Sequence, residues 1–130
     1  MNVTPQALGV TPSAATPIYF YTTPTDMRKG FDGLCGLVEQ ASDLSVTGGG
    51  LFVFVNRRRD RMKLLCFDGD GLVLWYKLLQ RGTWQVPAGT AGTAGTAQGG
   101  RLKVDARQLR LILDGVDLAS VKRRKRFVPQ

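Results

Sequence analysis

Chemistry in this sequence would have to come from arginine, lysine and aspartate side chains, because the chain contains no histidine. Without histidine, the commonest general base and a frequent metal ligand are both missing. The densest group of candidates is Arg57-Arg58-Arg59-Asp60-Arg61-Met62-Lys63, which is almost entirely basic. Guanidinium groups clamp phosphates through paired hydrogen bonds, so clusters of them attract DNA. The alternative is a solvated hairpin tip that Asp60 partly neutralises.

Further basic residues extend this candidate surface. Arg28 and Lys29 lie at the expected start of a helix, where exposed amides and basic side chains together can hold a phosphate, although the helix dipole does not itself favour cations there. Lys77 and Arg81 extend the surface further, and strand periodicity places Arg61 and Lys63 on one face. The predicted nucleic-acid-binding residues are Arg28, Lys29, Arg57, Arg58, Arg59, Arg61, Lys63 and Lys77.

Three aromatic residues lie close to this surface in the sequence, namely Trp75, Tyr76 and Trp84. Aromatic rings on a basic surface can stack on bases. The apolar pattern around them favours positions in the core or on a sheet face instead.

Acidic residues give only a weak case for catalysis. Asp68 and Asp70 lie in Asp-Gly-Asp-Gly between two strand-like runs, and a two-metal nuclease would need about three converging acids. Asp-Gly pairs are typical of tight hairpin turns, which explains these acids more simply. The chain also lacks a P-loop motif. We therefore predict a protein that is not an enzyme, with no catalytic residue, metal, cofactor or small-molecule substrate.

Composition indicates one small domain. The chain has 130 residues, 43% of them hydrophobic, and a net charge of +8, of which the basic run at 122–126 supplies +5. Cys35 and Cys66 lie in apolar patterns without metal-site spacing, so we expect reduced core thiols in a cytoplasmic protein. If it binds DNA as the arginine run suggests, it is expected to be nucleoid-associated. No apolar run is long enough to span a membrane, and the N-terminus does not resemble a signal peptide.

Two helices and several strands are predicted from periodicity and capping signals. A helix is expected at about 27–41, with Thr25 or Asp26 as its N-cap, and a second at about 106–114, which Asp105 begins and Gly115 ends. A stripe of glycines in the first helix (residues 30, 33 and 36) favours tight packing on a sheet, with close approach to a phosphate backbone as the alternative. Strands are expected at 18–23, 51–55, 61–67, 72–79 and 101–104, with a possible edge strand at 82–87.

The predicted fold class is α+β, a single small domain in which an antiparallel β-meander carries two helices. The strand at 72–79 is apolar on both faces, which places it in the centre of the sheet. The domain spans residues 18–118. Around it we expect a disordered leader at 1–17, a flexible Gly-Thr-Ala repeat loop at 88–100 and a solvated basic tail at 119–130.

Several separate motifs follow one another in a fixed order along residues 18–118. They are Thr25-Asp26-Met27-Arg28-Lys29-Gly30-Phe31-Asp32-Gly33-Leu34, Leu51-Phe52-Val53-Phe54, Arg58-Arg59-Asp60-Arg61-Met62-Lys63-Leu64-Leu65, Asp68-Gly69-Asp70-Gly71-Leu72, Tyr76-Lys77-Leu78-Leu79, Gln108-Leu109 and Leu113-Asp114-Gly115 with Asp117. In this order the motifs resemble the TnpB accessory proteins of the insertion-sequence family sixty-six. The Gly-Thr-Ala repeat and the long basic tail depart from that family pattern.

The resemblance implies a non-catalytic helper that transposition requires and that acts beside a separate transposase carrying the catalytic acids. It supplies no catalytic residue to carry over. Combined with the arginine run, it leads us to expect binding to DNA at the ends of the element. The alternative is a protein–protein adaptor that docks on the transposase of the same element.

Overall fold

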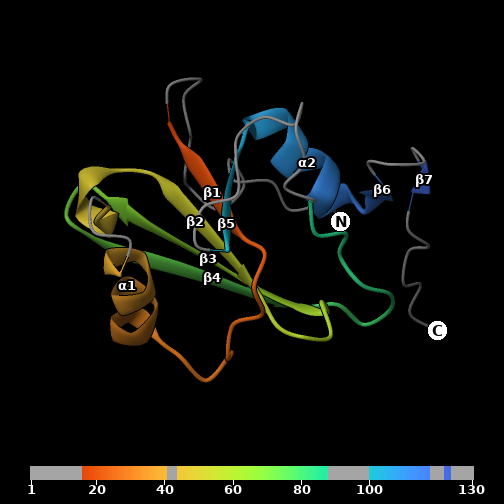
Figure 1. Ribbon diagram of the computed structural model, residues 1–130, viewed down its shortest axis with the longest axis horizontal. Helices are drawn as coiled ribbons and strands as arrows, with labels where there is room; N and C mark the ends of the chain where they lie inside the picture. Colours follow the sequence, from red (N-terminus) through yellow and green to blue (C-terminus); the bar gives the residue numbers. More distant parts are fainter. Residues whose placement is uncertain (1–15, 41–43, 88–99, 118–121, 124–130) are drawn as a thin grey trace.

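The computed structural model describes residues 16–40, 44–87, 100–117 and 122–123. They form a twisted five-stranded sheet in the order β4-β3-β2-β1-β5, with one helix on each face (Figure 1). This confirms the α+β class. The strands are β1 Ile18–Tyr21, β2 Leu51–Val55, β3 Arg61–Asp68, β4 Gly71–Leu78 and β5 Arg101–Val104, the helices are α1 Phe31–Glu39 and α2 Ala106–Asp114, and the short elements are η2 Val46–Gly48, β6 Val116–Asp117 and β7 Lys122–Arg123.

The sheet is mixed rather than purely antiparallel. β1 pairs with β2 in parallel, and α1 lies between them in the chain, while the other pairs of this sheet are antiparallel. Parallel neighbours need a crossover connection, and here a helix supplies it. The prediction of a simple meander is therefore wrong for β1. This strand lies between β2 and β5, parallel to β2, and α1 makes the crossover between β1 and β2.

The first helix is shorter than predicted at its start. It begins at Phe31 after Gly30, which has extended backbone angles and no capping side chain. Asp26 does not cap it, because its carboxylate accepts the amide of Arg28 in a preceding turn. The glycine stripe does not pack tightly on the sheet either, since a Cβ atom placed on Gly36 would meet nothing within 4 Å.

The second helix follows its capping signals closely. Asp105 accepts the amide of Gln108, whose side chain accepts the amide of Asp105 in return, a reciprocal capping box. Gly115 ends the helix with a φ of 79°, a left-handed conformation that favours glycine. Leu109, Ile112 and Leu113 are buried as predicted.

The strand at Gly71–Leu78 lies at the edge of the sheet, so its predicted central position is wrong. Its side chains are mostly half-buried, because the apolar layers on both sides of the sheet extend to this edge. The predicted turn is confirmed: Asp68 pairs with Gly71 across it, and Gly69 has a φ of 65°. Residues 82–87 do not form a strand.

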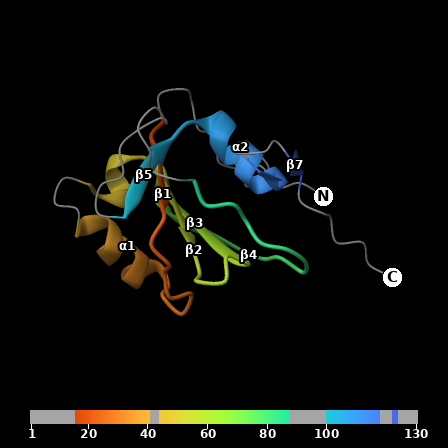
Figure 2. The same ribbon diagram turned by 45° about the vertical axis from the view of Figure 1, so that its right-hand side comes forward.

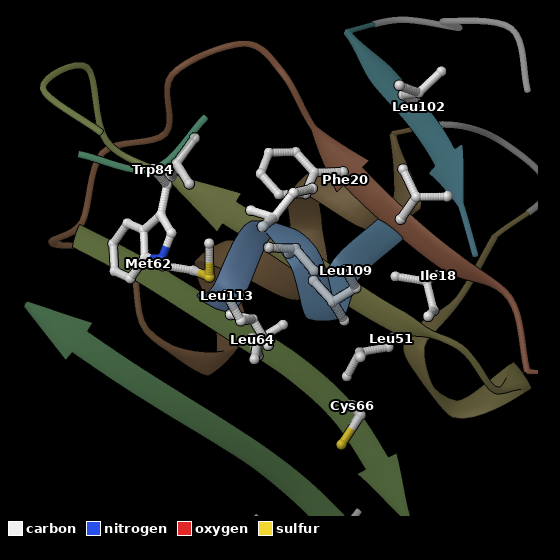
Figure 3. Close-up of a cluster of buried hydrophobic side chains, with 14 residues drawn as sticks. Ile18, Phe20, Leu51, Met62, Leu64, Cys66, Trp84, Leu102, Leu109 and Leu113 are labelled. Carbon is white, nitrogen blue, oxygen red and sulfur yellow. The ribbon is translucent and has the colours of Figure 1, made fainter. Parts of the chain in front are cut away.

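Strand alternation divides the core into two layers, and Figure 2 shows the helices on opposite sides of the sheet. The layer under α2 includes Trp84, which is 1% exposed, and Figure 3 shows it beside Met62 of β3. Cys66 is buried in this layer, and burial raises the pKa of its thiol, while Cys35 is half-buried. Both thiols are free. The layer under α1 contains Tyr21, Leu34, Val38, Val46, Phe52, Phe54 and Leu65.

Parts of the predicted flanking segments fall outside the described residues, namely 1–15, 88–99, 118–121 and 124–130. At the edge of the predicted leader, the Pro17 carbonyl accepts the amide of Leu51. Within the predicted tail, Lys122–Arg123 pair with Val116–Asp117 as a two-stranded ribbon, so that short part is not an unstructured tail. No helix in the described ranges is long and apolar enough to cross a membrane.

Candidate nucleic-acid interface

The basic run folds into a hairpin tip that Asn56 organises. The Asn56 side-chain oxygen accepts the amides of Asp60 and Arg61 at 3.0 and 2.9 Å, and its amide nitrogen donates to the Asp60 carboxylate at 2.7 Å. The Asp60 carboxylate is therefore directed toward Asn56. The side chains of Arg57, Arg58 and Arg59 are exposed. We call residues 57–59 the arginine tip.

Backbone hydrogen bonds tie the arginine tip to the segment that follows β4. The Arg59 carbonyl accepts the amide of Trp84 at 2.8 Å, and the Asp60 carbonyl accepts the amide of Leu79 at 2.7 Å. Arg81, which is exposed, lies between these two anchor points in the chain. Arg59 itself has a φ of 61°, a left-handed conformation that costs about 1–2 kcal/mol for a residue with a Cβ atom. The tip is thus held in a fixed and strained shape.

Lys63 does not contribute to an exposed phosphate surface, contrary to the prediction. It is only 6% exposed, and its ammonium group donates to the carbonyl oxygens of Met27 and Lys29, both at 2.8 Å. The same nitrogen lies 4.6 Å from the centre of the Tyr76 ring. The side chain therefore fastens the loop at residues 27–29 to the sheet, and its charge is used within the fold.

This fastening places a second basic segment beside the arginine tip. The Thr25 amide donates to the carbonyl of Val55, at the end of β2, at 2.8 Å. Figures 1 and 2 both show the orange loop before α1 and the yellow-green β2–β3 loop at the same end of the molecule. Arg28 and Lys29 are exposed on that loop. They precede Gly30, so they do not lie in the first turn of the helix.

Arg28 carries its own counter-ion. Its guanidinium group binds both carboxylate oxygens of Asp26, the shortest contact being 2.7 Å. Hydrogen bonds from Arg28 lower the pKa of Asp26 from 3.8 to about 2, and the carboxylate in turn raises the pKa of Arg28. The pair is exposed, so it is screened by solvent. Arg28 therefore adds less net positive charge than Lys29 does.

Arg61 lies on the α1 side of β3 with Lys63, as strand alternation predicts. Its guanidinium group donates to the Tyr76 hydroxyl at 3.2 Å. Tyr76 is 48% exposed, whereas Trp84 is buried and Trp75 packs half-buried against the α2 layer. Of the three aromatic residues considered from the sequence, Tyr76 is the most exposed.

The structure thus separates the predicted site residues into groups. Arg57, Arg58, Arg59 and Arg61 lie together, with the loop that carries Arg28 and Lys29 beside them. Lys63 lies beneath this surface. Lys77 pairs with Met62 in the strand register, so it belongs to the opposite face of the sheet. Sequence reasoning missed Asn56, although an asparagine before a turn is a common organiser of hairpin tips.

The acidic residues were the other candidates for chemistry. Within the described residues, no group of three His, Cys, Asp or Glu side chains is placed to hold a metal ion. Asp68 and Asp70 lie at the turn that connects β3 and β4. Arg61 and Leu78 pair at the opposite end of these strands, next to the arginine tip, so the two acids lie away from the tip.

Comparison with known proteins agrees with the order of the motifs. A family model described as IS66 Orf2-like protein matches residues 16–123. Two uncharacterized proteins of Sinorhizobium fredii (strain NBRC 101917 / NGR234) are similar: y4jC is 32% identical over 113 residues, which cover 87% of this chain and 90% of y4jC. The second, y4hO, is 34% identical over 100 residues, 77% of this chain and 80% of y4hO. No solved structure matches. The family match contains every motif quoted above, and so confirms the resemblance.

Proposed function

We propose that this chain, which belongs to the family of IS66 Orf2-like proteins, is a non-catalytic accessory protein of transposition that binds DNA through the arginine tip. The family implies the transposition-associated accessory role. DNA binding is our addition, with the ends of the element as the target and the transposase of the same element as the partner. Such a protein would work at the nucleoid.

One observation carries the proposal. The arginine tip has three exposed arginines in a loop whose own carboxylate, that of Asp60, is hydrogen-bonded to Asn56. Arg61, Lys29 and Arg81 add exposed positive charge around the same end. A fixed cluster of this kind can neutralise several phosphates without first having to order a flexible loop.

The salt dependence of binding tests the proposal quantitatively. If the three tip arginines, Arg61 and Lys29 each neutralise one phosphate, the logarithm of the affinity for duplex DNA should fall with the logarithm of salt concentration at a slope of about −4.5. Fluorescence anisotropy with labelled terminal-repeat DNA and with scrambled DNA measures this slope. A chain that stops after Leu118 removes the contribution of the basic run at 122–126.

Charge-matched variants locate the surface. Replacing Arg57 and Arg58 with serine should reduce the slope by about two. Replacing Arg107 and Arg110, which are exposed on α2, removes the same charge elsewhere and should leave the slope nearly unchanged. Equal effects of both pairs, or no binding by the truncated chain, would refute a specific role for the arginine tip.

Arg59→Gly separates binding from stability. Glycine adopts a φ of 61° without strain, which recovers about 1–2 kcal/mol, less about 0.4–1 kcal/mol for the added freedom of the unfolded chain. We expect a net stabilisation of about 0.5–1 kcal/mol together with weaker DNA binding. Urea unfolding and anisotropy on the same sample should therefore move in opposite directions. Weaker binding with lower stability would instead point to a damaged fold.

The open edge of the sheet favours a second function, docking on the transposase. Among the described strands, none pairs with the outer edge of β4, and Leu78 on this strand is 45% exposed. Unpaired strand edges are common sites of protein association. A pulldown of the transposase that survives nuclease treatment and is lost in Leu78→Glu would support this function. Loss of the pulldown after nuclease treatment would mean that DNA bridges the two proteins.

A further inference from the structure

We propose that the face of β3 and β4 beside the arginine tip is a stacking site for unpaired bases of single-stranded DNA, centred on Tyr76. This inference rests on the proposed DNA-binding function and adds the form of DNA that is bound. It assigns a binding role to an aromatic residue that remains exposed although Arg61 and Lys63 hold it in place.

The Tyr76 ring is exposed and yet held in place. Its hydroxyl accepts from Arg61 at 3.2 Å, and the Lys63 ammonium lies 4.6 Å from the ring centre. Lys63 is itself fixed by its two carbonyl partners. As a residue, Tyr76 is nevertheless 48% exposed. A ring held in this way loses little conformational freedom when a base stacks on it.

Two further large apolar residues are exposed, one on β4 and one at the start of α1. Leu78 is 45% exposed and lies two residues further along β4, on the same face as Tyr76. Phe31 is 44% exposed and begins α1, directly after the loop that Lys63 fastens beneath Tyr76. These are the large hydrophobic residues most exposed in the described part of the chain. Tyr76 and Leu78 share one face of β4 with Arg61 beside them, and an apolar surface next to a cation fits a partner that is both flat and negatively charged.

The charge pattern favours a nucleic-acid strand as that partner. Arg61 faces Leu78 across the strand pair and contacts Tyr76, so a cation is attached directly to the apolar surface. The arginine tip, residues 57–59, shortly precedes Arg61 in the chain. Lys29 is exposed on the loop before α1. Proteins that bind single strands combine a basic track for phosphates with aromatic rings for bases. In a duplex the base faces are stacked on one another, so the Tyr76 ring would find none to contact.

The test compares single-stranded and duplex forms of the same terminal-repeat sequence by fluorescence anisotropy. Removing a stacking ring costs about 1–3 kcal/mol per base, so Tyr76→Leu should weaken single-strand binding by about 5- to 150-fold. Duplex binding should change less than about twofold. Tyr76→Phe keeps the ring and should bind single strands within about threefold of the parent protein, while thermal unfolding of both variants reports on the fold.

A second readout does not depend on comparing variants. Ultraviolet crosslinking of the parent protein to a single strand that contains 5-iodouracil, followed by peptide mapping, should label Tyr76. A label that maps only to the arginine tip would overturn the stacking site.

The outcomes separate the two proposals. If neither form of DNA binds, the proposed function fails and the stacking site fails with it. If duplex binding depends on the arginine tip while Tyr76→Leu leaves single-strand binding unchanged, the stacking site alone is refuted. If Tyr76→Leu weakens binding of the transposase but not of DNA, this face is a protein-docking surface and the inference is wrong.

Discussion

The substitution Lys63→Met should release the loop at residues 27–29 from the sheet. Methionine keeps the apolar stem of the side chain and removes the ammonium group. The lost contacts are the two 2.8 Å hydrogen bonds to the carbonyls of Met27 and Lys29 and the cation–π contact with Tyr76. Because Lys63 is almost completely buried, the parent fold depends on those contacts to compensate for the desolvation of its charge.

The expected loss of stability follows from those contacts. Each hydrogen bond to a charged group contributes about 1.5–3 kcal/mol, and an exposed cation–π contact contributes about 0.5–1 kcal/mol. The lower limits of both energy ranges apply, because the loop is close to solvent and water can replace the ammonium group at the carbonyls of Met27 and Lys29. Removing a buried charge also recovers part of its desolvation cost. We therefore expect a decrease of about 2–3 kcal/mol in the free energy of unfolding, or about 10–20 °C in Tm for a domain of this size.

Two measurements check this prediction. Urea denaturation gives the global loss, and hydrogen exchange gives the local one, which should be largest at the amides of Thr25 and Lys29 because these hold the loop. The matched control is Lys103→Met on β5, where the lysine is exposed and the change should be within about 0.5 kcal/mol. Similar losses for Lys63→Met and Lys103→Met would refute the fastening role of Lys63.

DNA binding by the same variant tests the reassignment of Lys63. A lysine that contacts phosphate contributes about 0.9 to the salt slope for duplex DNA. Because the released loop carries Lys29, the comparison is made in a Lys29→Ser background, which removes that phosphate contact from both proteins. Since the Lys63 ammonium is used within the fold, adding Lys63→Met should then leave the slope unchanged at a temperature where the variant is folded. A slope reduced by about one would return Lys63 to the phosphate surface.

Three further predictions concern stability and protonation. Gly36→Ala should raise the free energy of unfolding, measured in urea, by about 1 kcal/mol, because the added Cβ meets nothing within 4 Å and glycine is unfavourable inside a helix. A lower free energy of unfolding would mean that this helix face is covered. Asp105→Ala should lower the free energy of unfolding by about 1 kcal/mol through loss of the capping box, while Asp105→Asn should retain most of the stabilisation. Equal losses of stability in the two variants would argue against the cap. In an NMR titration the Asp26 carboxyl should show a pKa of about 2, and Arg28→Gln should return it toward 3.8. Because the pKa is lower in the folded state, the stabilisation from this pair is present above about pH 4 and is lost as the pH falls toward 2; an Asp26 that titrates normally in the parent protein would contradict the pair.

Features set by neighbouring residues were predictable from the sequence. The strands at Leu51–Val55 and Arg101–Val104 have the predicted bounds, as does the helix from Ala106 to Asp114. A carboxylate cap, a left-handed glycine and an Asp-Gly turn each act within a few residues, so the local pattern determines them. The exposure of the arginine tip is of the same kind, since a turn of charged residues between two strands has few ways to become buried.

Features set by partners across the sheet were not predictable in the same way. The strand at Gly71–Leu78 is apolar on both faces and nevertheless lies at the edge, because the layers under α1 and α2 both reach it. The parallel position of β1 depends on the path of α1 over the sheet, which the spacing of apolar residues does not encode. The start of α1 was misplaced because Asp26, a good capping residue, binds Arg28 instead.

Lys63 shows how a charge run can mislead and what signal would have corrected the interpretation. Counting charges places it with the arginines, yet it is followed and preceded by apolar residues within β3, and Leu64 and Leu65 are both buried. A single lysine inside an apolar strand must either snorkel to solvent or find oxygen acceptors, because an unpaired buried ammonium group is too costly. Here the acceptors are carbonyl oxygens of the loop before α1, a segment distant in sequence. The motif around Lys63 and the motif around Met27 are therefore joined by these hydrogen bonds, which hold the loop on the sheet. The basic run therefore has two functions in the fold: its exposed part is available for phosphates, and its buried lysine positions the loop and the Tyr76 ring beside them.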